Sequence, residues 1–426
     1  MRNRRSFFLV VTALILGICA YTVNVLPKEP EQADALSREN IYTQLELFAD
    51  AISIINANYV DKVDPNALIY GALKGMLQSL DTHSGFLTPD QYEEIKIDTG
   101  GEFGGLGIEI SIEDNLLTII TPLEGTPAEK AGIMPGYRII RIDGESTEEL
   151  SLDECIKKMR GLPGTKITLT ILREDEEALR DYVLKRALIK VKSVKYALIL
   201  EDNVGYIRIT DFQQRTAQEL EKALRSIEKK GKLGGLILDL RNNPGGLLES
   251  SLQVAEQFLP KDSVIVSIKG KVDSQNEVFK SKNNRARVDF PIVVLVNKGS
   301  ASASEIVAGA IKDNKRGLIL GTPTFGKASV QTVIPLRDNS AIRLTTSKYY
   351  TPNGEQIHNV GIMPDVLLKK QMPTEEEVEE TLGIFDKLKI DNINLRINKL
   401  RQDNQVESAV ELIKGINVYR SFSKEK

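Results

Sequence analysis

Cysteine is almost absent from this chain of 426 residues, which has only Cys19 and Cys155. Cys19 lies inside an apolar N-terminal segment, and Cys155 is expected in a core. Two cysteines placed in this way exclude an intrachain disulfide framework in the rest of the chain and a cysteine-rich metal site. The sequence also has no cysteine/histidine cluster and no phosphate-binding loop, so we expect no metal, nucleotide or redox cofactor.

An excess of charge of one sign is missing as well. The chain has 56 lysines and arginines against 59 aspartates and glutamates, a formal net charge of −3 at pH 7, and no basic run longer than a few residues. A protein whose main partner is nucleic acid carries a basic patch or stripe. We therefore exclude nucleic acid as the main partner.

Histidine occurs only twice, at His83 and His358. His83 follows the predicted N-terminal helices, and His358 lies among turn residues near the end of the predicted core. Neither position favours a histidine base for a serine nucleophile, although the members of a catalytic triad need not be close in sequence. Lysine is the remaining candidate for such a base.

The N-terminus has the pattern of an export signal. Arg2, Arg4 and Arg5 precede an apolar run over residues 7–23. Positive charge at this position keeps the N-terminus in the cytoplasm and sends the rest of the chain outward. The run is close to the roughly 17 to 25 residues that span a membrane, and a cleavage site is poorly matched. We predict an uncleaved membrane anchor at residues 1–25 and an extracytoplasmic, bacterial-type envelope or periplasmic location; cleavage would give a secreted enzyme.

Changes in hydrophobic pattern divide the rest of the chain, which is too long for one ordinary core. We predict a linker at 26–37, a helical N-terminal domain at 38–97, a domain of short strands and small helices at 98–190, an α/β core at 191–370 and a helical tail at 371–426. The tail is expected to contribute accessory helices and no chemistry.

Apolar residues recur at alternating spacings of four and three in the N-terminal domain, which is the pattern of one helix face. They are Ile41, Leu45, Phe48, Ile52, Ile55 and Tyr59. Such a stripe forms either an intramolecular core or the seam of a homodimer. The sequence leaves both alternatives open.

The segment from 98 to 190 begins with a glycine-rich loop. Gly104-Gly105-Leu106-Gly107 leads into an alternating strand from Ile108, and Thr126 to Glu129 has the pattern of a capping box. This succession resembles a PDZ domain, which binds an extended C-terminus by strand addition while loop N–H groups capture the terminal carboxylate. The resemblance makes Leu106, Gly107 and Ile108 the peptide-binding loop. The alternative is that the glycines only permit a tight turn.

The core alternates strands and helices, with buried-type strands at Val204–Ile209, Leu236–Leu240 and Ile292–Val296. Three serines alternate with alanine between the last of these strands and the next helix, at positions 300, 302 and 304. A hydroxyl at a helix N-terminus lies near free N–H groups and the positive end of the helix dipole, which stabilise developing negative charge. The run therefore suits an acyl-transfer nucleophile, or else an ordinary N-cap.

Lys327 follows in Phe325-Gly326-Lys327-Ala328, a stretch of small and apolar residues. A closed apolar pocket favours the neutral amine, and lowering a lysine pKa by about three units costs about 4 kcal/mol. Lys327 in such a pocket would be a base. The alternative is a solvated surface charge.

In combination these motifs resemble the carboxy-terminal processing protease family. The matching segments are Gly299–Glu305, Phe325–Lys327 with Gln331 after it, Lys348–Gly354 and Gly361–Asp365, in that order. The resemblance covers residues from about 40 to 365. It implies a multidomain α/β chain with a crotonase-like strand/helix protease core, an inserted PDZ domain and a helical N-terminal domain.

The resemblance also implies catalytic roles. It makes Ser302 the nucleophile, Lys327 the general base and Gln331 the residue that orients the lysine. Asp313 matches an acidic position sometimes counted with the catalytic set, although an aspartate at a helix end is also a common structural feature.

Two further roles carry over from the same resemblance. The oxyanion hole combines the N–H of Ala303 with an N–H from the turn at Gly245 and Gly246, and the sequence does not choose between these glycines. Arg160 matches a position that signals PDZ occupancy to the core.

The predicted function is that of a serine endopeptidase. It recognises C-terminal tails of exported or membrane proteins through the PDZ domain and cleaves near them through an acyl-enzyme. One alternative is a non-catalytic PDZ scaffold or chaperone that delivers tails to another protease. A second is an acyl-CoA enzyme, because crotonase-type folds support that chemistry too and a fold does not determine a function.

Overall fold

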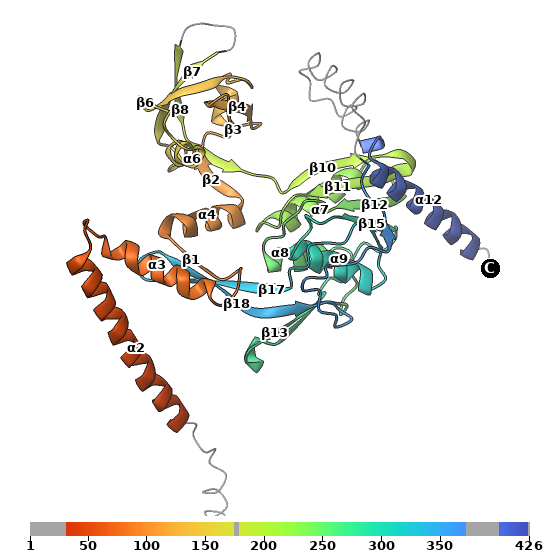
Figure 1. Ribbon diagram of the computed structural model, residues 1–426. Coiled ribbons are helices and arrows are strands. Elements are labelled where there is room, and N and C mark those ends of the chain that lie inside the picture. Colours follow the sequence, from red (N-terminus) through yellow and green to blue (C-terminus); the bar gives the residue numbers. More distant parts are fainter. Residues whose placement is uncertain (1–30, 174–178, 372–399, 425–426) are drawn as a thin grey trace, which may run out of the picture. The chain divides into compact units, whose positions relative to one another are not determined.

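The computed structural model of the protein describes residues 31–173, 179–371 and 400–424 (Figure 1). The predicted anchor at residues 1–25 lies outside these described residues, as does the first part of the predicted linker. Within them, no helix combines the length and the apolar character needed to cross a membrane. The chain forms two units, Met1–Met76 and Leu77–Lys426, and each is described by itself.

The first unit is helical. α2 (Glu31–Asn58) begins inside the segment predicted as a linker, and α3 (Pro65–Gln78) follows after a short connection. On α2 the side chains of Ile41, Leu45 and Phe48 are exposed. An apolar helix stripe normally packs against a covering partner, and the described part of this unit, residues 31–76, leaves these three side chains exposed.

The second unit begins with β1 (Gly85–Leu87) and α4 (Pro89–Gly100), followed by a small β-rich domain. Its main sheet has the order β3-β4-β5-β7-β8 with β6 paired to β5, and β2 pairs separately with β9. Cys155 is buried in its core, as expected. The elements are β2 (Glu102–Gly105), β3 (Ile108–Glu113), β4 (Leu116–Pro122), α5 (Pro127–Lys130), β5 (Arg138–Ile142), β6 (Glu145–Ser146), α6 (Leu152–Met159), β7 (Lys166–Leu172), β8 (Leu179–Lys185) and β9 (Ala187–Lys190).

The α/β core is built on two sheets. The larger has the order β10-β11-β12-β15-β16-β19 and is parallel from β11 to β19, while β10 runs antiparallel. The smaller has the order β1-β18-β13-β14, with β17 paired to β18. The strands are β10 (Val194–Ile199), β11 (Val204–Ile209), β12 (Gly235–Asp239), β13 (Val264–Gly270), β14 (Glu277–Lys280), β15 (Ile292–Val296), β16 (Leu318–Gly321), β17 (Ser329–Pro335), β18 (Ala341–Tyr350) and β19 (Val366–Leu367).

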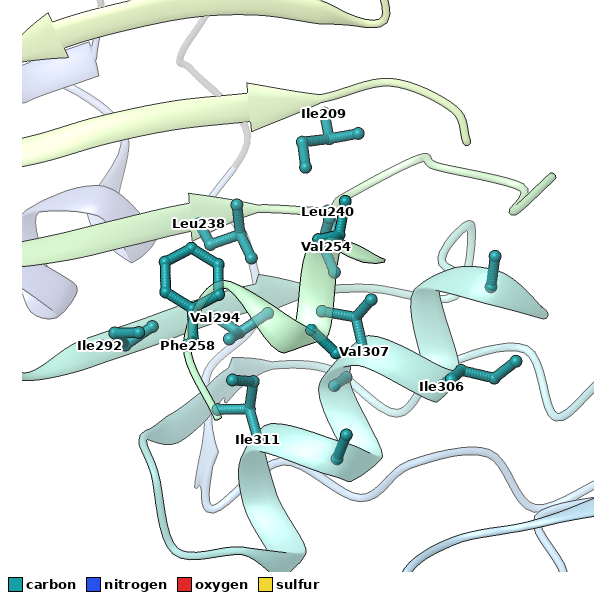
Figure 2. Packing of buried hydrophobic residues seen from close by; sticks show 14 of the residues in the cluster. Ile209, Leu238, Leu240, Val254, Phe258, Ile292, Val294, Ile306, Val307 and Ile311 are labelled. Carbon is teal, nitrogen blue, oxygen red and sulfur yellow. The ribbon is translucent and has the colours of Figure 1, made fainter. Parts of the chain in front are cut away.

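Helices cover both faces of the larger sheet. They are α7 (Thr216–Glu228), α8 (Leu248–Glu256), α9 (Ala303–Asp313) and α12 (Asn404–Lys424). Leu238 and Val294 point toward Phe258, which follows the end of α8, and toward Val307 of α9 (Figure 2). Alternate residues of the same strands, such as Ile237 and Val293, pack with α12 on the opposite face. Because each buried side chain of this size stabilises the fold by about 1.5–3 kcal/mol, the central strands are firmly fixed, and so are the loops at their ends.

Candidate active site

Ser302 stands between β15 and α9 in an unusual backbone conformation. Its φ is 53° and its ψ is −113°, a region that residues with a side chain rarely occupy. Such a conformation costs about 1–3 kcal/mol and persists only where the surroundings enforce it. Ser302 is the N-cap of α9 without a side-chain capping hydrogen bond, so its backbone is held by other groups.

The two neighbouring serines have structural roles. Ser300 Oγ donates to Leu240 O at 2.7 Å, and Ser304 Oγ donates to Asn243 O at 2.9 Å. Both serines are fully buried. Their hydroxyls tie the serine loop to the turn that follows β12, which distinguishes them from Ser302.

Glu305 holds the serine loop and the lysine loop together. Its carboxylate is 1% exposed and lies in the first turn of α9. The groups that donate to it are Ser302 N (2.8 Å), Lys327 N (2.9 Å), Gly326 N (2.6 Å), Thr324 Oγ1 (2.5 Å) and Tyr349 OH (3.2 Å). In the sequence, Glu305 stood out only as the last residue of the Gly299–Glu305 segment. The one feature that could have indicated its role is that it is a carboxylate three residues after a helix N-cap in an otherwise apolar stretch.

Tyr349 joins the same network from β18. Its hydroxyl lies 3.3 Å from Ser302 O and also contacts Lys327 O. Burial raises the pKa of Tyr349 well above its usual value, and the neighbouring Glu305 carboxylate adds to this effect. The phenol therefore stays protonated and acts as a donor.

Lys327 has the surroundings of a base. Its Nζ donates to Gln331 Oε1 at 3.4 Å. Burial lowers the pKa of Lys327, the positive charge of Arg343 lowers it further, and the Glu305 carboxylate opposes both effects. Within the described residues, Lys327 Nζ makes no hydrogen bond to Ser302 Oγ, so the connection between the two residues runs through their backbones and Glu305.

The turn after β12 lies directly against the serine. Gly245 has a φ of 107°, and a Cβ at this position would lie 2.8 Å from Ser302 Cβ, so only glycine fits. The N–H of Gly245 donates to Asn243 Oδ1 at 2.9 Å. Gly246 forms a parallel β-bridge with Phe212. In this bridge Phe212 N donates to Gly245 O, and Leu247 N donates to Phe212 O.

Two of the predicted residues lie away from this group. Asp313 is the last residue of α9 and accepts a hydrogen bond from Asn353 N at 3.0 Å. Arg160 ends α6 in the β-rich domain, where its guanidinium lies over the ring of Phe103, 5.0 Å from its centre. The structure therefore brings together Ser302, Lys327, Gln331 and the glycine turn, but not these two.

His83 is closer to the lysine than its sequence position suggested. Burial lowers the pKa of His83, and the positive charge of Lys327 is the next cause. The connection is β1, whose Gly85 pairs with Arg343 on β18. Arg343 Nε also donates to His83 O at 3.0 Å. No local pattern in the sequence marks such a pairing.

The predicted peptide-binding loop leads into β3. Gly107 has a φ of 73°, and a Cβ there would lie 2.3 Å from the side chain of Thr126. Thr126 does not form the predicted capping box; its hydroxyl instead donates to Leu123 O at 2.6 Å and lies 3.2 Å from Gly107 O. Thr126 therefore fixes the loop rather than the helix N-terminus.

The fold and the site define a peptidase with a PDZ domain, and comparisons with known proteins agree. Residues 203–368 match peptidase family S41, residues 94–172 match the PDZ domain, and residues 20–87 match the N-terminal domain of the activating protease CtpB.

Curated relatives identify the family. A carboxy-terminal-processing protease of Bartonella bacilliformis is 44% identical over 353 residues, which cover 82% of this chain and 80% of the relative. The carboxy-terminal processing protease CtpA of Bacillus subtilis is 36% identical over 374 residues, with coverage of 87% and 78%. This chain belongs to the carboxy-terminal processing protease family.

This chain is also similar to a solved structure. The photosystem II D1 C-terminal processing protease is 31% identical, covers 79% of this chain and 96% of its own, and has a TM-score of 0.43. The predicted family and the predicted fold class, an α/β protease core with a PDZ domain and a helical N-terminal region, are confirmed.

Proposed function

We propose that this peptidase cleaves polypeptides near their C-terminal tails through an acyl-enzyme on Ser302, with Lys327 as the general base. The observation that carries the proposal is the Glu305 carboxylate, which binds the backbone N–H of both residues. This arrangement holds a strained serine at the N-terminus of α9 and a partly desolvated lysine in one network. Both residues then meet the requirements of an activated nucleophile and its base.

The proposed reaction begins when neutral Lys327 takes the proton of Ser302 Oγ. The oxygen attacks the peptide carbonyl carbon, and the resulting oxyanion accepts hydrogen bonds from the N–H of Ala303 and an N–H of the turn at Gly245 and Gly246. The peptide C–N bond then breaks as the protonated lysine gives its proton to the leaving amine, which leaves an acyl-enzyme. Water, deprotonated by the same lysine, attacks the ester carbon; the bond to Ser302 Oγ breaks, the acid product leaves, and the lysine returns the proton to Ser302 Oγ. Gln331 orients the amine between these steps.

Ala303 suits the role of oxyanion donor because it is the first residue of α9 and its N–H has no acceptor within the helix. Asp313 has no proposed part in these steps, because its distance along α9 from Ser302, about 16 Å for about eleven residues, is too large for direct contact. We assign Asp313 a structural role at the Asn353 turn.

Substrate tails are proposed to bind along β3, with their terminal carboxylate at Leu106, Gly107 and Ile108 and with Arg160 signalling occupancy. Peptides that end in a free carboxylate should then be cleaved with a lower KM than the same peptides ending in an amide. Equal KM values for the two forms would contradict this part of the proposal.

Export and self-association complete the proposal. Residues 1–25 would anchor the protein with its catalytic part outside the cytoplasm, and the exposed apolar residues of α2 would form a homodimer seam. Phe48→Lys should then convert a dimer into a monomer in sedimentation, whereas Lys62→Glu, at an exposed position after α2, should not. A wild-type monomer would exclude the seam.

The first experiment measures cleavage of an unstructured protein with an apolar C-terminus. Ser302→Ala and Lys327→Ala should each lower kcat/KM by at least about a thousandfold, whereas Ser226→Ala, at an exposed serine of α7, should leave it unchanged. Ser300 is a poor control because its buried hydroxyl supports the loop. If Ser302→Ala cleaves as well as wild type, a PDZ scaffold becomes the better explanation, and acyl-CoA hydrolysis by wild type would favour the crotonase-type alternative.

A further inference from the structure

A buried ionic network lies at the end of β12, next to the proposed oxyanion turn. Asp239 is fully buried and accepts from Arg241 Nε at 3.0 Å, from Arg241 Nη2 at 2.7 Å and from Tyr206 OH at 2.6 Å. Arg241 itself is 6% exposed. A guanidinium at this depth needs partners for all of its donors, because an unpaired buried charge is strongly destabilising.

The C-terminal segment supplies the remaining partners. Arg241 Nη1 donates to both carboxylate oxygens of Asp403, at 3.0 and 2.8 Å, and to Gln405 Oε1 at 2.8 Å. Asp403 precedes α12, and its Oδ1 also accepts from Gln405 N at 3.1 Å. The Asp403 carboxylate therefore binds Arg241 and also caps α12, the helix that packs on the Ile237 and Val293 face of the larger sheet.

Arg241 is also the first residue of the turn that faces the nucleophile. Within this turn, Asn243 O accepts from Ala301 N at 3.0 Å and from Ser304 Oγ at 2.9 Å. Gly245 lies against Ser302 and Ala303. An unbroken series of contacts thus runs from Asp403 through Arg241 and the turn to the serine loop.

We propose that Asp403 and Gln405 are positioning residues, and that the C-terminal segment is part of the catalytic unit because it fixes the oxyanion turn through Arg241. This inference rests on the proposed function of Ser302. Neither residue touches the reacting atoms; both act through the Arg241 guanidinium. Their loss leaves the fold in place but gives the turn freedom to move relative to Ser302 Oγ.

The test uses the full chain with Asp403→Asn, Asp403→Glu and a matched control, Glu407→Gln, which removes an exposed carboxylate from the first turn of α12. Asp403→Asn should lower kcat by about 10- to 100-fold, somewhat less than the loss of a whole oxyanion donor, with KM changed less than about twofold. Asp403→Glu should recover part of the loss, and Glu407→Gln should resemble wild type.

A second variant separates positioning from stability. Ile413→Val removes a buried methylene-sized group of α12 from the sheet face and should lower the unfolding temperature without lowering kcat per folded molecule. The inference is overturned if Asp403→Asn is folded and keeps kcat within about twofold of wild type. It is also overturned if Ile413→Val and Asp403→Asn lower kcat equally.

Hydrogen exchange gives a readout that does not depend on cleavage. In Asp403→Asn the amides of Asn242, Asn243, Gly245 and Gly246 should exchange at least about tenfold faster than in wild type, and in Glu407→Gln they should not. Unchanged exchange would refute the proposed role of Asp403 in fixing the turn. If wild type cleaves nothing but exchange responds as expected, the proposed function fails, while the inference that Asp403 fixes the turn through Arg241 stands.

Discussion

Two loops meet at Ser302, and each is held by a buried carboxylate with a different kind of partner. Asp239 shares a network with a cation, Arg241, whose other donors reach the C-terminal segment. Within the described residues, Glu305 accepts only from N–H groups and hydroxyls that carry no charge. The comparison indicates that the turn after β12 is fixed by an ion pair, whereas the lysine loop is fixed without one.

The difference agrees with the chemistry proposed for each loop. As the proposed base, the Lys327 amine must be neutral, and a carboxylate paired with its Nζ would favour the charged form. Backbone N–H groups and hydroxyls satisfy Glu305, while Lys327 Nζ donates to Gln331. No such restriction applies near Asp239, where a permanently charged arginine is a suitable partner.

Among the changes that test this comparison, Glu305→Gln has the largest expected effect. The glutamine amide has the size of the carboxylate but only one acceptor oxygen. Its NH₂ group would therefore face some of the N–H and hydroxyl donors that now bind Glu305. We expect kcat/KM to fall by about 100- to 1000-fold and the free energy of unfolding to fall by about 3 kcal/mol or more. Cleavage assays and urea unfolding measure the two quantities, and Glu249→Gln, in the exposed first turn of α8, is the control. A variant within threefold of wild type would show that the neutral-donor network is dispensable.

Two tyrosines give the next test. The Tyr206 hydroxyl donates a hydrogen bond to Asp239, and the Tyr349 hydroxyl donates one to Glu305. Tyr349→Phe and Tyr206→Phe should each lower the free energy of unfolding by about 1–3 kcal/mol. Tyr349→Phe should also lower kcat/KM by about tenfold, since its hydroxyl contacts Ser302 O and Lys327 O. Tyr206→Phe should change kcat/KM by less than about threefold, because the Asp239–Arg241 pair remains. The reverse order of effects on kcat/KM would contradict the comparison.

The smallest expected effect concerns pH. After burial, the charge of Arg343 is the next cause that lowers the pKa of Lys327, so Arg343→Gln should raise that pKa. Because the neutral amine is the active form in the proposed reaction, the acidic limb of the kcat/KM profile should move to higher pH, while the rate at the plateau stays close to that of wild type. Arg337→Gln, at an exposed position between β17 and β18, is the control.

If the acidic limb of the kcat/KM profile moved to lower pH in Arg343→Gln, a group other than Lys327 would determine that limb. His83 is the neighbour to examine, because its pKa responds to Lys327. His83→Gln should leave the acidic limb in place if Lys327 is the titrating base.

Local patterns predicted the central strands well. The buried runs at Val204–Ile209 and Ile292–Val296 are β11 and β15 with the same bounds, because a continuous apolar run between turn residues has few other stable solutions. The placement of the serine loop at a helix N-terminus follows from the same pattern.

Contacts between distant segments had no such signal. Tyr349 lies in a strand and Thr324 in a loop, and nothing in their neighbourhoods indicates that both bind Glu305. Asp403 and Gln405 belong to a tail that was expected to hold no chemistry, yet they bind Arg241 from 162 and 164 residues away. Periodicity reports which face of an element is buried, and it does not report which polar groups meet across the fold.

The backbone of Ser302 has a consequence for the evolution of stability. Glycine adopts a φ of 53° without the steric conflict that a side chain brings, so selection for folding alone would place glycine at position 302. With Ser302 as the proposed nucleophile, a chain with that replacement would be more stable but inactive as a protease. On that proposal, position 302 is a trade-off in which folding stability and catalysis require different residues.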